Sequence, residues 1–158
     1  PEVVFMDEPT QGLDPEISHE LRGVIADLAK GGKTIFLTTH YMFEADELCR
    51  RVAVINRGRI IALDSPANLK KHVAGQRVIE AEFFGSTEKL AEEIRQISDV
   101  SLVTNEIVEQ RVIMKIQTAD PASVVPKLTA KMGDVKLIDF RIREPTLEDA
   151  YLKLVGAA

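Results

Sequence analysis

The sequence predicts an α/β chain in two parts, a segment of parallel sheet followed by a small α+β domain. Residues 3–6 and 34–38 are short, largely apolar runs without polar alternation, which is typical of strands buried on both faces of a parallel sheet. A segment of helical periodicity, residues 16–30, lies between them, as a crossover between parallel strands requires. Beyond residue 76 the strands alternate apolar and charged residues, which indicates a sheet with one solvated face.

The composition is that of a soluble globular protein and argues against several classes. The 158 residues suffice for one ordinary domain or two small ones, and they are 45% hydrophobic and 28% charged. A net charge of -5 without a basic block argues against a nucleic-acid partner. The single Cys49 excludes an internal disulfide, and no apolar run is long enough for a transmembrane helix. Because a strand is expected at the third residue, we expect the chain to be part of a longer protein.

The first strand leads directly into a group of polar residues. Asp7 and Glu8 follow residues 3–6, and Pro9 prevents the strand from continuing. A buried strand followed by an ordinary loop would account for one carboxylate. It accounts poorly for two adjacent carboxylates that are followed by further polar residues up to Asp14. Ligands of parallel sheets bind at the carboxyl ends of strands, so this end is the candidate site.

The helix expected over residues 16–30 has recognisable start and stop signals. Asp14 is the expected N-cap, with Pro15 at the first helical position, and two glycines follow Lys30. The expected apolar face consists of Ile17, Leu21, Val24, Ile25 and Leu28.

Residues 31–34, Gly-Gly-Lys-Thr, end in the letters of a phosphate-binding loop but have the wrong spacing and context. Such a loop needs a glycine five residues before its last one, where this sequence has Asp27. It also joins a strand to a following helix, whereas here a helix precedes a strand. We interpret the segment as a helix stop.

The strand over residues 34–38 leads into His40. A histidine at the edge of a sheet is by default a structural residue. Because one crossover helix separates this strand from residues 3–6, the two strands are expected to be parallel neighbours, and His40 is then expected close to the two carboxylates.

Residues 3–15 resemble the Walker B motif and the following D-loop of ABC-type ATPases. The resemblance implies that Asp7 holds Mg²⁺ through its water shell and that Glu8 is the general base for the water that attacks ATP. It also implies that Asp14, with Gly12 in the same loop, lies at the nucleotide-dependent interface with a second ATP-binding subunit.

His40 resembles the H-loop histidine of the same family, which contacts the γ-phosphate and the attacking water. Residues 41–71 are similar to the segment that follows in transporter-type members. The elements expected there are a helix, a hairpin turning at Gly58 and a short helix after Ser65-Pro66, at residues 41–50, 52–56 with 60–63, and 67–72.

A boundary is expected near residues 73–76, so that the predicted domains are residues 1–73 and 74–158. Strand–helix–strand occurs twice in the second, the split βαβ pattern of ferredoxin-like domains. The strands are expected at residues 77–84, 100–108, 111–117 and 135–142, and the helices at 88–97, after Asp120-Pro121 and at 146–154. Expected caps are Ser86 or Thr87 for the first helix and a capping box of Thr146 and Asp149 for the last.

The second domain shows no cluster of ligand-binding residues in its sequence, and its acidic residues are expected on a solvated face. Residues 143–152 resemble the ending of the C-terminal extension found in ATP-binding subunits of the drug- and antibiotic-export type. With the first resemblance, this covers the whole chain as the C-terminal part of such a subunit. The implied fold is the C-terminal part of a P-loop NTPase core followed by a ferredoxin-like domain.

The family resemblance implies an ATPase subunit that uses ATP and Mg²⁺ to drive export through a separate membrane-spanning permease. A homodimer with a second ATP-binding subunit, at the cytoplasmic face of the membrane, is expected. The P-loop and the Leu-Ser-Gly-Gly-Gln motif are absent from these residues, so the chain as given is expected to be inactive, with a gap in its sheet where the P-loop strand belongs. Alternatives are a non-catalytic regulatory or dimer-stabilising C-terminal domain and an ABC ATPase without a transporter.

Overall fold

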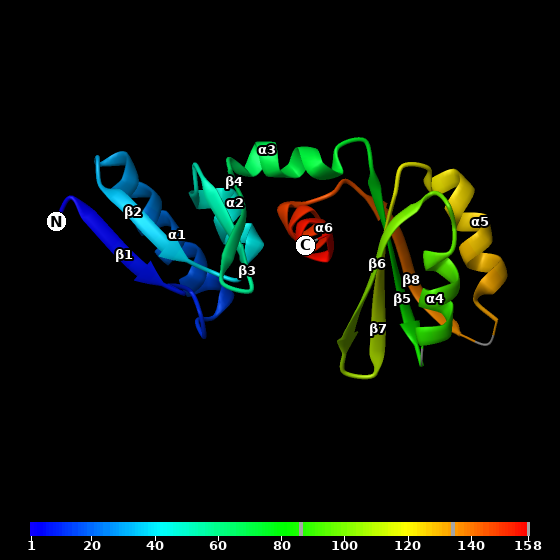
Figure 1. Ribbon diagram of the computed structural model, residues 1–158. Helices are drawn as coiled ribbons and strands as arrows, with labels where there is room; N and C mark the ends of the chain where they lie inside the picture. Colours follow the sequence, from blue (N-terminus) through cyan, green and yellow to red (C-terminus); the bar gives the residue numbers. More distant parts are fainter. Residues whose placement is uncertain (86, 134, 158) are drawn as a thin grey trace. The chain divides into compact units, whose positions relative to one another are not determined.

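The computed structural model describes residues 1–85, 87–133 and 135–157 (Figure 1). The chain divides into two compact units, Pro1–Lys71 together with Ala150–Ala158, and His72–Asp149. The last helix, α6 (Leu147–Ala157), therefore begins in the second unit and continues in the first. The fold is mixed α/β, with one parallel and two antiparallel sheets among the described residues. The domain boundary between residues 73 and 74 remains a prediction.

The first unit opens with the expected pair of parallel strands. β1 (Val3–Asp7) pairs with β2 (Thr34–Thr38), and Phe5 lies opposite Phe36 in the register. The crossover is α1 (Pro15–Lys30), which ends at Gly31 as predicted. Asp14 caps it, since its side chain accepts a hydrogen bond of 2.9 Å from the Ile17 amide.

The prediction that these strands are buried on both faces is wrong for this structure. Phe5 and Phe36 are 75% and 60% exposed, while the residues on either side of each phenylalanine in its strand are half-buried. The reason is that, in the described part of the chain, β1 and β2 form a sheet of two strands only. The apolar face of α1 is likewise open, because Ile25 alone among its five predicted members is buried.

The rest of the first unit forms a separate antiparallel hairpin between short helices. The hairpin consists of β3 (Val52–Asn56) and β4 (Arg59–Asp64), joined by Arg57 and Gly58 in the left-handed conformation that a two-residue turn requires. The helices are α2 (Met42–Leu48) and α3 (Pro66–Lys70); the 3₁₀ turn Lys71–Val73 follows α3, and its last two residues belong to the second unit. α2 is shorter than predicted, because Cys49 adopts an extended backbone conformation.

The second unit has the element order predicted from the sequence, β-α-β-β-α-β. Its sheet is antiparallel throughout, in the order β6-β7-β5-β8, and its core lies between the sheet and the two helices (Figure 1). The strands are β5 (Arg77–Phe84), β6 (Val100–Val108), β7 (Arg111–Thr118) and β8 (Lys136–Arg143), and the helices are α4 (Glu88–Arg95) and α5 (Pro121–Lys131). The side chains of Ile79, Phe83, Ile94, Met114, Ile116 and Leu128 are fully buried in this core.

The helix caps of the second unit agree with the prediction only in part. Asp120 caps α5 by accepting a hydrogen bond of 3.2 Å from the Ser123 amide. Thr87 stands at the N-cap of α4 but makes no side-chain capping bond; its buried hydroxyl instead accepts a 3.3 Å hydrogen bond from the Asn105 amide group. The alternative cap, Ser86, lies outside the described residues.

The prediction of a solvated acidic face is wrong for Glu80. Its carboxylate, 11% exposed, accepts hydrogen bonds from Arg141 and Arg143 of the neighbouring strand β8. Arg143 also contacts Asp149, which is buried in the first turn of α6. Asp149 accepts from the amide and hydroxyl of Thr146, at 2.7 and 2.9 Å, so it supplies the acidic side of the predicted capping box.

Candidate functional site

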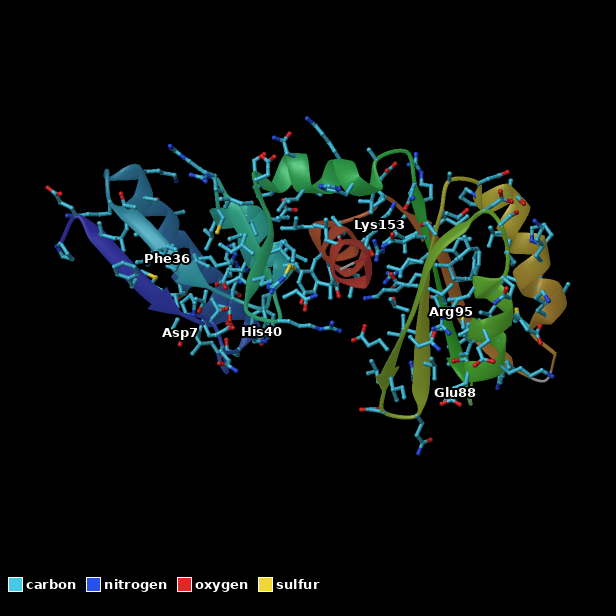
Figure 2. All side chains as sticks on the ribbon, in the orientation of Figure 1. Asp7, Phe36, His40, Glu88, Arg95 and Lys153 are labelled. Atoms are coloured by element: carbon cyan, nitrogen blue, oxygen red, sulfur yellow. The ribbon has the colours of Figure 1, made fainter. Side chains whose placement is uncertain are left out.

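The two strands of the parallel pair end at the same edge, and the predicted site residues lie there. Asp7 is the last residue of β1, Glu8 follows it, and His40 comes two residues after the end of β2. Figure 2 shows Asp7 and His40 at the same end of this strand pair, with Phe36 farther back along β2. The parallel crossover thus brings together groups separated by more than thirty positions in the sequence.

Glu8 and His40 are in direct contact. His40 Nδ1 lies 2.8 Å from Glu8 Oε2, and the His40 backbone amide donates to the same oxygen at 3.3 Å. When Glu8 is ionised it can only accept, so Nδ1 carries the proton and Nε2 of a neutral ring faces away as an acceptor. The side chains are 28% and 55% exposed, which leaves the pair open to a ligand.

The two residues that flank His40 in the sequence, Thr39 and Tyr41, make contacts that define its surroundings. The ring of Tyr41 lies against it, with 4.1 Å between the ring centroids. The Thr39 hydroxyl accepts a 3.0 Å hydrogen bond from the Tyr41 amide, which fixes the turn into α2.

Asp7 has a separate partner, Thr38, which the sequence interpretation did not single out. The Thr38 hydroxyl donates to Asp7 Oδ1 across the last pair of the β1–β2 register. The Glu8 amide donates to the Thr38 carbonyl oxygen at 3.0 Å and lies 3.3 Å from its hydroxyl oxygen. The available signal was the parallel register itself, which sets residue 38 opposite residue 7.

The backbone at Glu8 is in the left-handed region, with φ of 45°. This conformation is uncommon for a residue with a side chain and costs on the order of 1 kcal/mol. The contacts with Thr38 and His40 hold it in place. Because of this turn, Glu8 does not continue the alternating side-chain directions of β1. Its carboxylate contacts His40, whereas the carboxylate of Asp7 contacts Thr38.

Gly12 and Asp14 lie in the loop beyond the two carboxylates. Gly12 has φ of 77°, which suits glycine, and the loop is closed by hydrogen bonds from Gln11 N to Glu8 O and from Leu13 N to Thr10 O. Asp14 serves as the cap of α1, and no hydrogen bond or ion pair within the described residues joins it to the Glu8–His40 pair. Its expected place at a subunit interface remains a prediction.

The residues fit a magnesium ion that takes most of its ligands from elsewhere. Among the described residues there is no group of three or more His, Cys, Asp or Glu side chains able to hold a metal. Mg²⁺ is commonly bound through one or two carboxylates, with water and substrate phosphates completing its shell. Asp7 offers such a carboxylate, in an exposed position beside Glu8.

Two kinds of comparison with known proteins agree with this arrangement. A family model described as "AAA domain, putative AbiEii toxin, Type IV TA system" matches residues 1–46. The chain is 32% identical to the linearmycin resistance ATP-binding protein LnrL of Bacillus subtilis, over 99% of this chain and 50% of that protein. It is 36% identical to the daunorubicin resistance ATP-binding protein DrrA2 of Streptomyces coeruleorubidus and 38% identical to the Nod factor export ATP-binding protein I of a Rhizobium species, in each case over 99% of this chain and 48% of the relative.

The strand–helix–strand unit and the family match support the general α/β class of P-loop nucleoside triphosphatases. Within it, the chain is similar, along nearly its whole length and at 32–38% identity, to ATP-binding proteins whose names refer to antibiotic resistance and to export. The chain spans about half the length of these relatives. Among the described residues, no helix has the length and apolar character needed to cross a membrane.

Proposed function

We propose that this chain supplies the hydrolytic half of an ATP site in the ATPase subunit of an exporter. The observation that carries the proposal is the contact of 2.8 Å between Glu8 and His40, formed by two parallel strand ends with Asp7 beside it. An adjacent carboxylate pair and a facing imidazole provide a metal contact, a base for water and a polar group for phosphate. Phosphoryl transfer needs this kind of positioning and electrostatic stabilisation.

The proposed roles follow the geometry of these side chains. Asp7 would hold Mg²⁺ through a water molecule, and the ion, when bound, would supply positive charge to neutralise the phosphates. Glu8 accepts a proton from the water that attacks the γ-phosphate of ATP. His40 shares its Nδ1 proton with Glu8, so its Nε2 is directed away from that carboxylate and is available to the phosphate or the water.

We further propose that residues 1–73 are the C-terminal half of a nucleotide-binding domain and residues 74–158 a ferredoxin-like extension. Two features support the first part. β2 and β3 belong to separate two-stranded sheets, as they would if the strand that joins them belonged to another part of the domain, and the exposed faces of Phe5 and Phe36 would be covered by further layers. These 158 residues alone contain no P-loop, so by themselves they do not hydrolyse ATP.

The complete subunit would act with two partners. A second ATP-binding subunit, forming a homodimer, would meet the loop of Gly12 and Asp14, and a membrane-spanning permease would carry the substrate. The subunit would then act in the cytoplasm, at the inner face of the membrane. The names of the relatives, which refer to antibiotic resistance and to export, support this assignment at the level of class.

The test is made in the complete protein that carries this segment. Glu8→Gln should retain ATP binding and lower turnover by a factor on the order of 10²–10⁴, because the base is lost while shape is kept. His40→Ala should lower turnover as well. Glu20→Gln, an exposed change on α1, is the matched control and should leave turnover unchanged. Turnover of Glu8→Gln close to the wild-type value would refute the proposed role of Glu8.

A further inference from the structure

We infer that Thr38 is a positioning residue that sets the metal-binding carboxylate of Asp7 and the backbone of Glu8 at the same time. The inference rests on the proposed function, since it concerns how the metal and base groups of that site are held. Thr38 itself is assigned no contact with ATP or with the attacking water.

The position of Thr38 in the sheet makes this double contact possible. It lies opposite Asp7 in the parallel register, and both residues belong to the exposed face of the strand pair, the face that also carries Phe5 and Phe36. The side chains therefore meet beyond the aromatic pair, at the edge where the site begins. This face is open to solvent, so burial alone does not restrict the rotamer of Asp7.

The hydrogen bonds of Thr38 use both its side chain and its backbone. A threonine hydroxyl can donate one hydrogen bond and accept two. Here it donates to Asp7 Oδ1 and lies 3.3 Å from the Glu8 amide nitrogen, whose hydrogen is shared with the Thr38 carbonyl oxygen at 3.0 Å. One residue thus contacts the side chain of one carboxylate and the backbone of the next.

These contacts fix the Asp7 carboxylate, the proposed metal ligand, relative to Glu8, the proposed base. The contact with Oδ1 orients the Asp7 carboxylate and leaves its second oxygen, Oδ2, for the metal side. The contact with the Glu8 amide helps to hold the left-handed turn, at φ of 45°, that directs the Glu8 side chain towards His40. Without the hydroxyl, Asp7 would sample other rotamers and the metal would be bound less tightly.

The test compares variants of the complete protein that differ at this hydroxyl. Thr38→Val keeps the β-branched shape, Thr38→Ser keeps the hydroxyl, and Thr34→Val makes the same change at the other end of β2. Binding of Mn²⁺, a spectroscopic substitute for Mg²⁺, is measured by electron paramagnetic resonance in the presence of a non-hydrolysable ATP analogue. The Mg²⁺ concentration for half-maximal ATPase activity is measured in parallel.

Thr38→Val should weaken Mn²⁺ binding about tenfold, the expected effect of losing one hydrogen bond to a charged group. It should raise the half-saturating Mg²⁺ concentration similarly, while affinity for the metal-free nucleotide stays unchanged. Thr38→Ser should restore wild-type values, and Thr34→Val should not differ from wild type. Thr38→Ala, which also lacks the hydroxyl, repeats the test if the valine variant is unstable.

Mn²⁺ binding within twofold of wild type in both hydroxyl-free variants would overturn the inference, and so would equal losses in Thr38→Ser and Thr38→Val. Failure of the proposed function has a different outcome. In that case Glu8→Gln would retain turnover, or the wild-type protein would bind no nucleotide, whatever residue stands at position 38.

Discussion

Arg143 holds the buried carboxylate of Asp149 with two hydrogen bonds, from Nη1 to Oδ2 at 2.7 Å and from Nη2 to Oδ1 at 3.2 Å. The same guanidinium donates through Nε to Glu80 on β5. One arginine at the end of β8 therefore joins the sheet to the first turn of α6. Burial by itself would lower the pKa of Arg143, but its hydrogen bonds to Asp149 and Glu80 outweigh that effect, and the pKa is raised above its ordinary value.

Replacing Arg143 should destabilise the second unit strongly. Arg143→Met keeps much of the side-chain length but leaves Asp149 without its charged partner in a buried position. Breaking a buried ion pair in this way costs about 3 kcal/mol. Urea denaturation of the 158-residue chain measures the effect, with Arg95→Met at the exposed end of α4 as the control. A loss no larger than that of the control would contradict the importance of the contact.

The stability of the chain should fall at acid pH because of Asp149 and Glu80. Burial would raise the pKa of each carboxyl, but hydrogen bonds from Arg143 to both, from Arg141 to Glu80 and from Thr146 to Asp149, hold the pKa below its ordinary value. A lowered native pKa stabilises the fold above the unfolded pKa of about 4, and this contribution is lost as the pH falls through the native value.

Denaturation of the chain between pH 7 and pH 3 measures this dependence. The free energy of unfolding should change little down to about pH 5 and decrease below about pH 4. In Asp149→Asn the decrease should be shallower, because one of the two lowered carboxyls is gone. An equally steep decrease in wild type and Asp149→Asn would show that other groups dominate.

Glu44 should be a site where substitution stabilises the isolated chain. It is 1% exposed in the first turn of α2, and neither carboxylate oxygen has a hydrogen-bond partner among the described residues. A buried, unpaired carboxylate is costly, and apolar replacement of buried charges is often neutral or stabilising by about 1–4 kcal/mol. Glu44→Met should therefore raise the free energy of unfolding in urea, whereas the exposed Glu20→Met should not. A destabilised Glu44→Met would mean that Glu44 finds a partner in solution.

Two phenylalanines in strands should respond very differently to truncation. Phe83 is fully buried in the core between the sheet and α4 and α5, whereas Phe36 is 60% exposed. Phe83→Ala should cost about 3–5 kcal/mol, through lost burial and the cavity left behind. Phe36→Ala should cost less than about 1 kcal/mol in the 158-residue chain, because it removes a mostly solvated ring. Thermal denaturation of both variants checks the contrast, and equal losses would contradict the observed exposure of β2.

Much of the local structure could be predicted from the sequence because its causes are local. The caps of α1 and α5 depend on Asp14 and Asp120, each three residues before the amide that it accepts from. The turn at Gly58 and the turn that follows α1 at Gly32 use the left-handed backbone region, at φ of 75° and 88°, which glycine adopts readily. The pairing of Glu8 with His40 could also be anticipated, because a single crossover helix between two apolar runs implies parallel neighbours.

The remaining features depend on groups far apart in the sequence. Thr38 reaches Asp7 only through the register of two strands, and hydroxyl side chains have many possible partners. Thr87 occupies the expected cap position, but contact with Asn105 on β6 takes its hydroxyl away from the helix. In the same way, the alternating pattern of its strand predicts that Glu80 is solvated. The arginines that bind its carboxylate come from the neighbouring strand β8, which the local sequence does not reveal.

By itself, the sequence determined the order of strands and helices and the parallel pair, and it pointed to the candidate site residues, because periodicity, capping and crossover length act over short distances along the chain. The tertiary structure alone decided which surfaces are covered, which carboxylates are paired and how Asp7 is oriented. The exposed Phe5 and Phe36 illustrate the difference: an apolar run predicts a strand that can be buried, but burial requires a second layer, and its position is a property of the assembled molecule.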